Sequence, residues 1–247
     1  MKNIVIVGAT SGIARACAKI WVSDLTEVQL TLLVRDEVRG ERVAQDLQVR
    51  NPKANVKVLS VNFEDAHLIQ KTVHELVSNQ APDIVLIAHG VLSDQFECEK
   101  NLLATKESLQ INGVSPVLFA HEFALQMSKV DCGTLAVIGS VAGDRGRKSN
   151  YIYGASKGLI EIFVRGMQHR FADRNFQVSL IKPGPTGTAM TEHLKGSTPL
   201  ANVDDVAAQI VGGLEKRKSV IYAPVKWAFI MWVIRHLPDC VFNRLNI

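Results

Sequence analysis

Short and nearly continuous apolar runs recur along the chain, and segments with the apolar spacing of helices separate them. Apolar runs of this kind favour strands of a parallel sheet that is covered on both faces. Their alternation with helices favours right-handed crossovers, and therefore a doubly wound α/β sheet in one domain. The pattern predicts strands over residues 3–7, 28–34, 56–61, 84–88, 134–139 and 178–181, and helices over 12–22, 37–50, 66–79, about 104–129 and 152–173.

The last segment departs from this alternation. Residues 227–234 read WAFIMWVI, between Lys226 and Arg235, and such a run falls far short of the about 20 residues that span a bilayer. Two interpretations remain open for the tail of residues 225–247. It forms a helix that covers a pocket or contacts a partner subunit, or it lies on a membrane surface or over a lipid-like ligand. We predict a main domain over residues 1–224, followed by this tail.

Composition narrows the function classes. The chain has 247 residues, 47% of them hydrophobic and 21% charged, which suits one large soluble α/β domain. The net charge of +4 is small, and no basic run alternates with aromatic residues, so we expect no nucleic acid partner. Four distant cysteines and seven histidines without ligand spacing predict free thiols and no metal site. The first residues lack a signal-peptide pattern, which favours a cytoplasmic protein.

A glycine-containing loop follows the first predicted strand and opens the first predicted helix. Its sequence is Gly-Ala-Thr-Ser-Gly-Ile-Ala over residues 8–14. A glycine at the end of a strand permits a tight turn, and small residues let the backbone approach a pyrophosphate at the helix N-terminus. The spacing differs from Gly-x-Gly-x-x-Gly, and a plain tight turn is the alternative. We predict that a dinucleotide cofactor contacts Gly8, Thr10, Ser11, Gly12 and Ile13.

The end of the second predicted strand indicates which dinucleotide binds. Val34 stands where an acidic residue would bind the ribose of NAD, and Arg35 follows it. A guanidinium there can pair with the 2′-phosphate of NADP. Asp36 is a counter-argument, since it could turn inward and accept from the ribose, and Arg35 and Arg39 could equally be solvated charges. We predict NADP(H), with NAD(H) as the alternative.

Ser140, Tyr153 and Lys157 form the candidate catalytic set. A tyrosine four residues before a lysine on a helix places the phenol and the ammonium on one face. The positive charge of Lys157 should lower the pKa of the Tyr153 phenol, so that the phenol can transfer a proton near neutral pH. Ser140 could hold a substrate oxygen against that phenol. The same Tyr-x-x-x-Lys spacing also arises by chance on solvated helices.

The glycine loop and the Ser140, Tyr153 and Lys157 set together resemble the short-chain dehydrogenase/reductase family over almost the whole chain. The resemblance implies a Rossmann-type sheet of about seven strands and a homodimer or homotetramer. It also implies that Ser140 orients a carbonyl, that Tyr153 is the general acid/base, and that Lys157 binds the nicotinamide ribose. Further positions that match the family are Asn112 for a proton-relay water, and Gly90, Pro183, Gly184, Thr186 and Thr188 at the cofactor. Asn62 stands where the family often has an aspartate that contacts the adenine, and its amide can still donate and accept there.

Two departures from the family pattern stand out. Ala14 replaces the third glycine of the loop, and Ile-Ala-His-Gly over residues 87–90 replaces the usual Asn-Asn-Ala-Gly. His89 could contact the cofactor, although a packed structural histidine is the simpler interpretation.

A basic cluster between Ser140 and Tyr153 bears on the substrate. Arg145, Arg147 and Lys148, together with the apolar tail, are similar to family members that reduce a keto sugar on a polyprenyl phosphate. That resemblance implies that the three cations face a substrate phosphate, that the tail contacts a lipid chain at the inner membrane face, and that a flavin oxidase partner supplies the keto sugar. Alternatively, the basic loop is solvated and the tail is an oligomer contact. A generic small-molecule ketoreductase or alcohol dehydrogenase, and a non-catalytic dinucleotide-binding regulator, also remain open.

Overall fold

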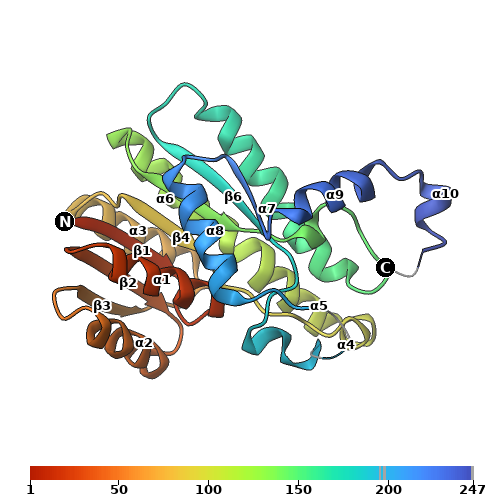
Figure 1. Ribbon diagram of the computed structural model, residues 1–247, viewed down its shortest axis with the longest axis horizontal. Coiled ribbons are helices and arrows are strands. Elements are labelled where there is room, and N and C mark those ends of the chain that lie inside the picture. The colour runs from red at the N-terminus through yellow and green to blue at the C-terminus, as the bar shows by residue number, and fades with distance from the viewer. Residues whose placement is uncertain (195, 197–198, 246–247) are drawn as a thin grey trace.

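Seven strands form one parallel sheet in the order β3-β2-β1-β4-β5-β6-β7 (Figure 1). The computed structural model describes residues 1–194, 196 and 199–245. Adjacent strands pair in parallel, with Ile4 of β1 opposite both Leu30 of β2 and Ile84 of β4. The predicted doubly wound α/β fold is therefore confirmed. The strands are β1 (Lys2–Val7), β2 (Val28–Val34), β3 (Asn55–Ser60), β4 (Ile84–Ile87), β5 (Thr134–Ile138), β6 (Gln177–Pro183) and β7 (Val220–Ala223).

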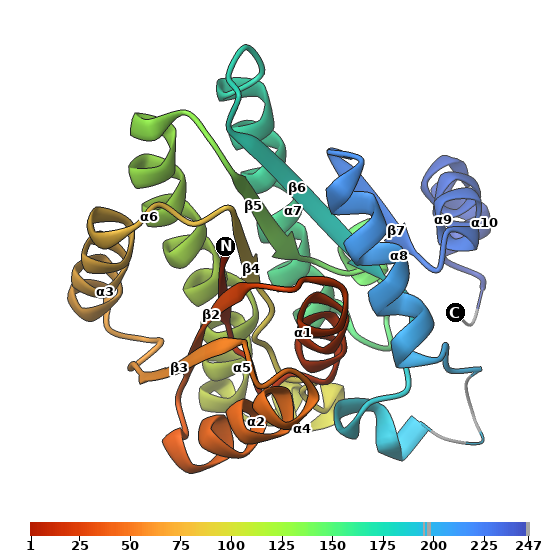
Figure 2. The ribbon, with the colours of Figure 1, turned by 60° about the vertical axis from the view of Figure 1, so that its left-hand side comes forward.

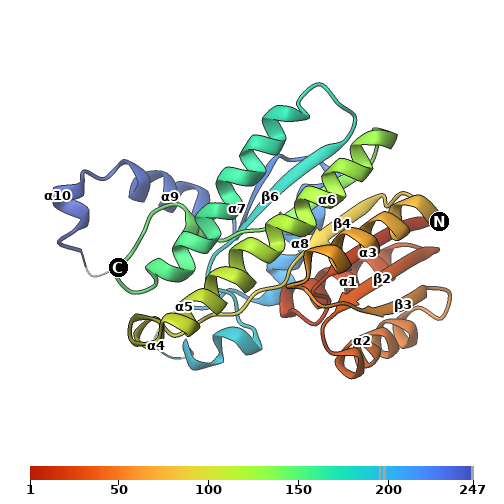
Figure 3. The same ribbon diagram turned by 180° about the vertical axis from the view of Figure 1, so that it is seen from behind.

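Helices cover both faces of the sheet, and each face carries its own apolar core. Successive side chains of a strand point to opposite faces, so Ile4 and Ile6 of β1 belong to one core and Val5 and Val7 to the other. Figure 2 shows α1, α2 and α8 on the first face, and Figure 3 shows α3, α6 and α7 on the second. The long helices are α1 (Gly12–Asp24), α2 (Glu37–Arg50), α3 (Ala66–Asn79), α6 (Ser115–Val130), α7 (Tyr151–Arg170), α8 (Val203–Glu215) and α9 (Lys226–His236).

Two helical regions show where the hydrophobic pattern was incomplete. The single helix predicted over about 104–129 is divided by a π-helical turn, η1 (Gln110–Val114), which holds Asn112. The pattern gave no helix at α8, whose Gly212 and Gly213 disfavour a helix, although Gly213 lets the helix pack directly on Ile221 of β7. The remaining short elements are α4 (Gln95–Lys100), α5 (Leu102–Leu109), η2 (Val141–Gly143), η3 (Ala189–Leu194) and α10 (Asp239–Phe242).

The strand order reverses between β1 and β4, because the chain winds outward from this point in both directions. In doubly wound sheets ligands bind at such a switch point, outside the carboxyl ends of the strands. The tail forms α9 and α10 beyond β7, at one end of the molecule (Figure 1). No helix within the described residues is both long enough and apolar enough to cross a membrane.

Candidate active site

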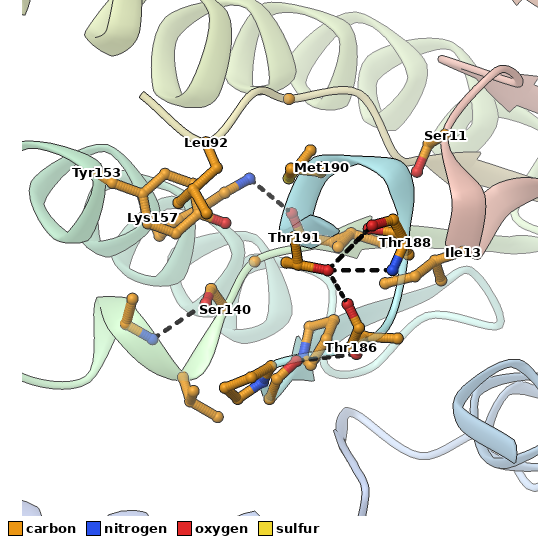
Figure 4. A pocket seen from close by; sticks show the side chains of 18 of the residues that line it. Ser11, Ile13, Leu92, Ser140, Tyr153, Lys157, Thr186, Thr188, Met190 and Thr191 are labelled. Atoms are coloured by element: carbon orange, nitrogen blue, oxygen red, sulfur yellow. Dashed lines mark hydrogen bonds between the residues drawn. The ribbon is translucent and has the colours of Figure 1, made fainter. Parts of the chain in front are cut away.

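The principal pocket lies at the carboxyl ends of β1, β4, β5 and β6, and has an empty volume of about 940 Å³ including its open mouth. Figure 4 shows Tyr153, Lys157 and Ser140 on one side of it and Ser11 and Ile13 on the other, with the loop of Thr186 to Thr191 between them. The candidate catalytic residues and part of the predicted cofactor loop thus meet at one pocket.

Local structure places the catalytic side chains. Ser140 follows β5 and caps η2, where its hydroxyl accepts a hydrogen bond from the amide of Ala142 at 3.1 Å. Tyr153 and Lys157 lie one turn apart near the start of α7. The Lys157 ammonium is 5.7 Å from the centre of the Tyr153 ring and donates to the Ile138 carbonyl at 3.3 Å. The helical spacing therefore puts phenol and ammonium on one face, as predicted.

The electrostatics of this pair differ from the prediction. Burial raises the pKa of Tyr153 to about 12, against a smaller lowering by its hydrogen bond with Ser140. Burial also lowers the pKa of Lys157 to about 8. Desolvation disfavours the charged form of both groups, so here it outweighs the lowering that was expected from the lysine. Tyr153 is consequently held as the neutral phenol, the form that can donate a proton.

Asn112 reaches the same centre from η1. Its side-chain oxygen accepts from the amide of Val91 at 2.8 Å, and its amide lies 3.4 Å from the Ser108 hydroxyl. A Cβ atom added to Gly90 would lie 2.9 Å from the Asn112 oxygen and 3.6 Å from the Lys157 ammonium. Asn112 and Lys157 thus converge on Gly90, and the absence of a side chain there lets both approach. π-Turns of this kind are frequent at functional sites.

The glycine loop fits a pyrophosphate. Gly8 has a φ of 81°, and a side chain at this position would overlap His89. Ser11 is the N-cap of α1 without a side-chain capping bond, so the first amides of the helix remain available to an anion. Ser11 and Ile13 line the pocket and Thr10 is exposed. A side chain at Gly12 would approach Thr188 to 2.8 Å, which brings the loop against the segment after β6.

The end of β2 carries an exposed cation. Arg35 is exposed and shares a shallow hollow with Asn62 and the end of β3. The carboxylate of Asp36 accepts from the amide of Arg39 at 3.0 Å and pairs with the Arg39 guanidinium at 3.4 Å. Asp36 therefore caps α2 and does not turn toward the ribose position. The residues present fit an adenosine 2′-phosphate, with Arg35 as its cation.

The loop after β6 lines the pocket between the catalytic residues and the glycine loop. Pro183, Gly184, Thr186 and Thr188 line the pocket. Thr191, which the sequence analysis missed, fixes this loop, because its hydroxyl donates to the Thr186 carbonyl at 2.5 Å and accepts from the Thr188 amide at 3.0 Å. Its one signal in the sequence is a hydroxyl three residues beyond Thr188, which is typical of a local turn.

The three basic residues between Ser140 and Tyr153 have different surroundings. Arg145 donates to the carbonyls of Ile234 and Leu237 and to the Asp239 carboxylate, each at 2.6 Å, so the structure gives it a different role from the predicted phosphate contact. Lys148 is exposed and does not line the pocket. Arg147 does line it. Only one of the three predicted cations therefore faces the pocket.

His89 lies in an aromatic cluster and also borders the pocket. Its ring meets Phe63 and Phe119 edge-on, and its Nε2 lies 2.9 Å from the Ser115 hydroxyl. That hydroxyl donates to the Phe63 carbonyl at 2.6 Å, so Nε2 carries the proton. Burial, together with the charges of Lys157 and Arg35, lowers the pKa of His89 to about 3. The ring is neutral and packed.

A cluster of three charged side chains connects segments that border the pocket. Lys182 of β6 pairs with Asp144 and, at 2.6 Å, with Glu161 of α7. The side chains of Lys182 and Asp144 are each 1% exposed, and the cluster joins β6, the loop after β5 and α7. Burial raises the pKa of Asp144, and Lys182 opposes that rise. No group of three or more metal-ligating side chains occurs within the described part of the chain.

A seven-stranded doubly wound sheet with a glycine loop at its switch point and a Ser-Tyr-Lys set at its pocket defines an NAD(P)-dependent oxidoreductase. The family model described as short chain dehydrogenase matches residues 2–198. The chain therefore belongs to the short-chain dehydrogenase/reductase family.

Curated relatives agree with this class. An uncharacterised oxidoreductase of Streptomyces coelicolor is 26% identical over 99% of this chain and 96% of its own length. A 3-oxoacyl-[acyl-carrier-protein] reductase of Bos taurus is 26% identical over 83% of this chain and 86% of its own length.

Solved structures share the fold. A short-chain dehydrogenase from Sphingobium yanoikuyae in complex with NADPH has a TM-score of 0.82 at 18% identity and covers 100% of this chain and 97% of its own. A Burkholderia cenocepacia short chain dehydrogenase in complex with NADP has a TM-score of 0.81 at 15% identity and covers 100% of both chains.

Proposed function

We propose that this protein reduces a ketone to an alcohol with NADPH. The single observation that carries the proposal is the convergence of Ser140, Tyr153 and Lys157 on one pocket that the glycine loop also borders. The predicted set comes from two separate elements, the loop after β5 and helix α7, so a chance helical spacing does not account for it.

The residues divide the reaction between them. The cofactor, when bound, supplies the hydride that the carbonyl carbon accepts. Ser140 donates a hydrogen bond to the carbonyl oxygen as negative charge develops there. Tyr153 transfers its phenolic proton to the same oxygen, which completes the alcohol. Lys157 stabilises the tyrosinate left behind and holds the nicotinamide ribose, and Asn112 positions the water that returns the proton.

NADP(H) is the proposed cofactor. Gly8, Thr10, Ser11, Gly12 and Ile13 would hold its pyrophosphate. Arg35 would pair with the 2′-phosphate while Asp36 stays on the α2 cap. The remaining residues proposed at the cofactor are Asn62, Gly90, Pro183, Gly184, Thr186 and Thr188. The NADPH and NADP complexes of proteins with a similar fold support this choice.

Replacement of the proton donor tests the reaction. Tyr153→Phe should lower ketone-dependent NADPH oxidation by about 10² to 10⁴-fold, the usual contribution of a positioned acid, while NADPH still binds. Turnover within about threefold of the wild type would overturn the proposal. Binding of NADPH without ketone turnover in the wild type, over a broad panel of ketones, would indicate a non-catalytic regulator instead.

A second proposal concerns the substrate, and the tail favours it. Phe229 and Trp232 of α9 are 70% and 60% exposed and stack on each other, and Trp227 of the same helix packs on Gly184 at the pocket. An apolar face beside the pocket suits a lipid chain. The substrate would then be a keto sugar on a polyprenyl phosphate, as for decaprenylphosphoryl-2-keto-ribose reductase, with a flavin oxidase partner that makes the keto sugar. The generic ketoreductase, which the 3-oxoacyl reductase relatives favour, is the alternative.

Vesicle binding separates these two substrates. A cytoplasmic enzyme that acts on a lipid-linked sugar at the inner membrane face should co-sediment with phosphatidylglycerol vesicles, and the double variant Phe229→Ser/Trp232→Ser should not. Equal sedimentation of the wild type and the variant, or none of either, would favour the generic ketoreductase.

A homodimer or homotetramer is proposed as well. Leu102 and Leu103 of α5 and Ile162 of α7 are 85%, 75% and 77% exposed, and α5 and α7 are in contact. An apolar surface of this kind is typical of a subunit interface. A monomer mass in light scattering at micromolar concentration would contradict this proposal.

A further inference from the structure

Arg147 is a partly buried cation that forms no ion pair with any described residue. Its Nε atom is inaccessible to solvent and has no hydrogen-bond partner among these residues. Its one hydrogen bond within the described residues joins Nη2 to the Met231 sulfur at 3.4 Å. A thioether is a weak acceptor, so these residues satisfy little of the donor capacity of this guanidinium.

The neighbouring acidic group does not supply the missing partner. The carboxylate of Asp144 attracts Arg147 at a distance, but it is paired with Lys182, which Glu161 also binds. Burial lowers the pKa of the Arg147 guanidinium from its usual value. A charge that is partly withdrawn from water costs free energy when no ion pair compensates it. Because Arg147 lines the pocket, a ligand bound in the pocket would supply the missing negative charge.

A second unpaired group borders the same pocket. Asn150 is the N-cap of α7, the position where a side chain ordinarily accepts from the helix amides, but it makes no such bond. Its Oδ1 atom is inaccessible to solvent and has no partner. Arg147 and Asn150 both line the pocket that holds Ser140 and Tyr153. An unused donor and an unused acceptor thus belong to two side chains that line the pocket near the proposed reaction centre.

We propose that Arg147 and Asn150 form a substrate subsite, in which Arg147 binds an oxyanion of the substrate, a carboxylate or a phosphate, and Asn150 accepts a hydrogen bond from a donor beside that oxyanion. This inference rests on the proposed function only in that the pocket receives the substrate of the reaction. Carboxylates and phosphates match the fork of a guanidinium and give short, strong, charge-assisted hydrogen bonds. An uncharged analogue leaves the guanidinium unpaired, so the subsite selects anionic substrates.

The tail fixes the geometry of this subsite. Met231 of α9 is fully buried and touches Arg147. Two residues earlier in the same loop, Arg145 caps the carboxyl end of α9 through Ile234 and Leu237 and stacks on the Phe242 ring at 3.8 Å. The two arginines of this loop therefore have different roles. Arg145 binds the tail, and the tail in turn contacts Arg147 through Met231.

Calorimetric titration tests the subsite without requiring turnover. The protein is saturated with NADP⁺ and titrated with phenyl phosphate, benzoate and benzyl alcohol, which share a ring and differ in charge. At least one of the two anions should bind about tenfold or more tightly than benzyl alcohol, which corresponds to one charge-assisted pair. The stronger of the two identifies the oxyanion. Wild-type protein that binds neither anion more tightly than the alcohol would overturn the proposal.

Variants distinguish a binding role for Arg147 from a structural one. Arg147→Met should abolish the preference for the anion, and Arg147→Lys should retain part of it, because the charge remains and the fork is lost. Lys148→Met is the matched control, because Lys148 is exposed and does not line the pocket, and it should keep the preference. Retention of the full preference in Arg147→Met would overturn the proposal.

The melting temperature of the ligand-free variant provides an independent readout. Arg147 forms no ion pair with a described residue, and Asp144 keeps Lys182 as its partner, so Arg147→Met should melt at or above the wild-type temperature without ligand, whereas removal of a structural arginine would lower it. A lowered melting temperature together with unchanged anion affinity would show a structural role. Failure of ketone reduction in the Tyr153 experiment would refute the proposed reaction and leave these binding results to be judged separately.

Discussion

The two sides of the pocket are held in place in different ways. On the cofactor side, Gly8 and Arg35 lie immediately after β1 and β2, and Gly90 lies three residues after β4, so the strand ends place all three. On the substrate side, the loop after β5 depends on residues far along the chain, since Arg145 binds carbonyls 89 and 92 residues away. The comparison indicates that cofactor binding follows from the sheet, whereas substrate binding depends on how the tail packs.

Replacement of Lys182 should produce the largest effect, on the substrate side. Lys182→Met leaves Asp144 and Glu161 without their shared cation in a buried place. Removal of one partner from a buried ion pair costs about 3–5 kcal/mol. The free energy of unfolding, measured with urea, should fall by that amount.

An exposed ion pair supplies the control for Lys182. Arg50→Met removes the partner of Asp46 at the surface, a contact of 3.2 Å between half-exposed side chains, and should change the free energy of unfolding by less than about 1 kcal/mol. If Lys182→Met were as mild as Arg50→Met, the ion cluster would not be what holds the substrate side together.

Replacement of Arg145 should release the tail and leave the cofactor side unchanged. Arg145→Met removes three hydrogen bonds at 2.6 Å and the stacking on Phe242. Since hydrogen bonds to charged groups contribute about 1.5–3 kcal/mol each and the freed carbonyls regain water, local opening of α9 should become easier by about 2 kcal/mol. Hydrogen exchange of the α9 amides should therefore accelerate by about 30-fold.

The amides of α2 provide the internal reference for this experiment, because α2 begins beside Arg35 on the cofactor side. They should exchange at wild-type rates. Equal acceleration of α2 and α9 would mean that the tail stabilises the whole domain, and the proposed independence of the two sides would be lost.

The sequence predicted the cofactor side better than the substrate side, and the reason is physical. Apolar runs and glycines report local backbone requirements, so six strands and the glycine loop lie where the pattern put them. The Tyr153 and Lys157 pair depends only on helical spacing. Arg145 and Arg147, by contrast, read as equivalent members of one basic loop. Their separation depends on contacts with α9, and no local pattern encodes contacts of that range.

The same limit explains other differences between sequence and structure. The basis for the raised pKa of Tyr153 is burial by the surrounding fold, which cannot be read from a lysine four residues away. Asn150 carries an ordinary N-cap signal, but its side-chain oxygen is buried without a partner among the described residues, in a side chain that lines the pocket. The π-turn at Asn112 interrupts a segment whose apolar spacing predicts one continuous helix. Each departure lies at or beside the candidate active site.

Replacement of Arg35 tests the cofactor side directly. Arg35→Ala should weaken NADPH binding by about 10- to 100-fold, because a charge-assisted contact to a phosphate contributes about that much. The same variant should leave NADH binding within about threefold of the wild type. Fluorescence titration of both cofactors provides the measurement. Arg39→Ala is the control, since Arg39 pairs with Asp36 at the surface, and an equal loss of NADPH and NADH affinity in Arg35→Ala would contradict the NADP preference.

Lys157 belongs to both the substrate side and the cofactor side of the pocket, because it lies beside Tyr153 and approaches Gly90. The titration of its ammonium should produce the smallest of the expected effects. The folded-state pKa of Lys157 is lowered to about 8, so its ammonium is present below that pH and is lost above it. Tyr153, with a pKa of about 12, and His89, with a pKa of about 3, keep one protonation state between pH 6 and 10. In ketone reduction at saturating NADPH, kcat/KM should therefore be level up to about pH 8 and fall by about tenfold at pH 9, as the ammonium that stabilises the tyrosinate disappears. A profile that stays level to pH 10 would mean that the charge of Lys157 contributes little to proton transfer, and that Lys157 serves the cofactor side alone.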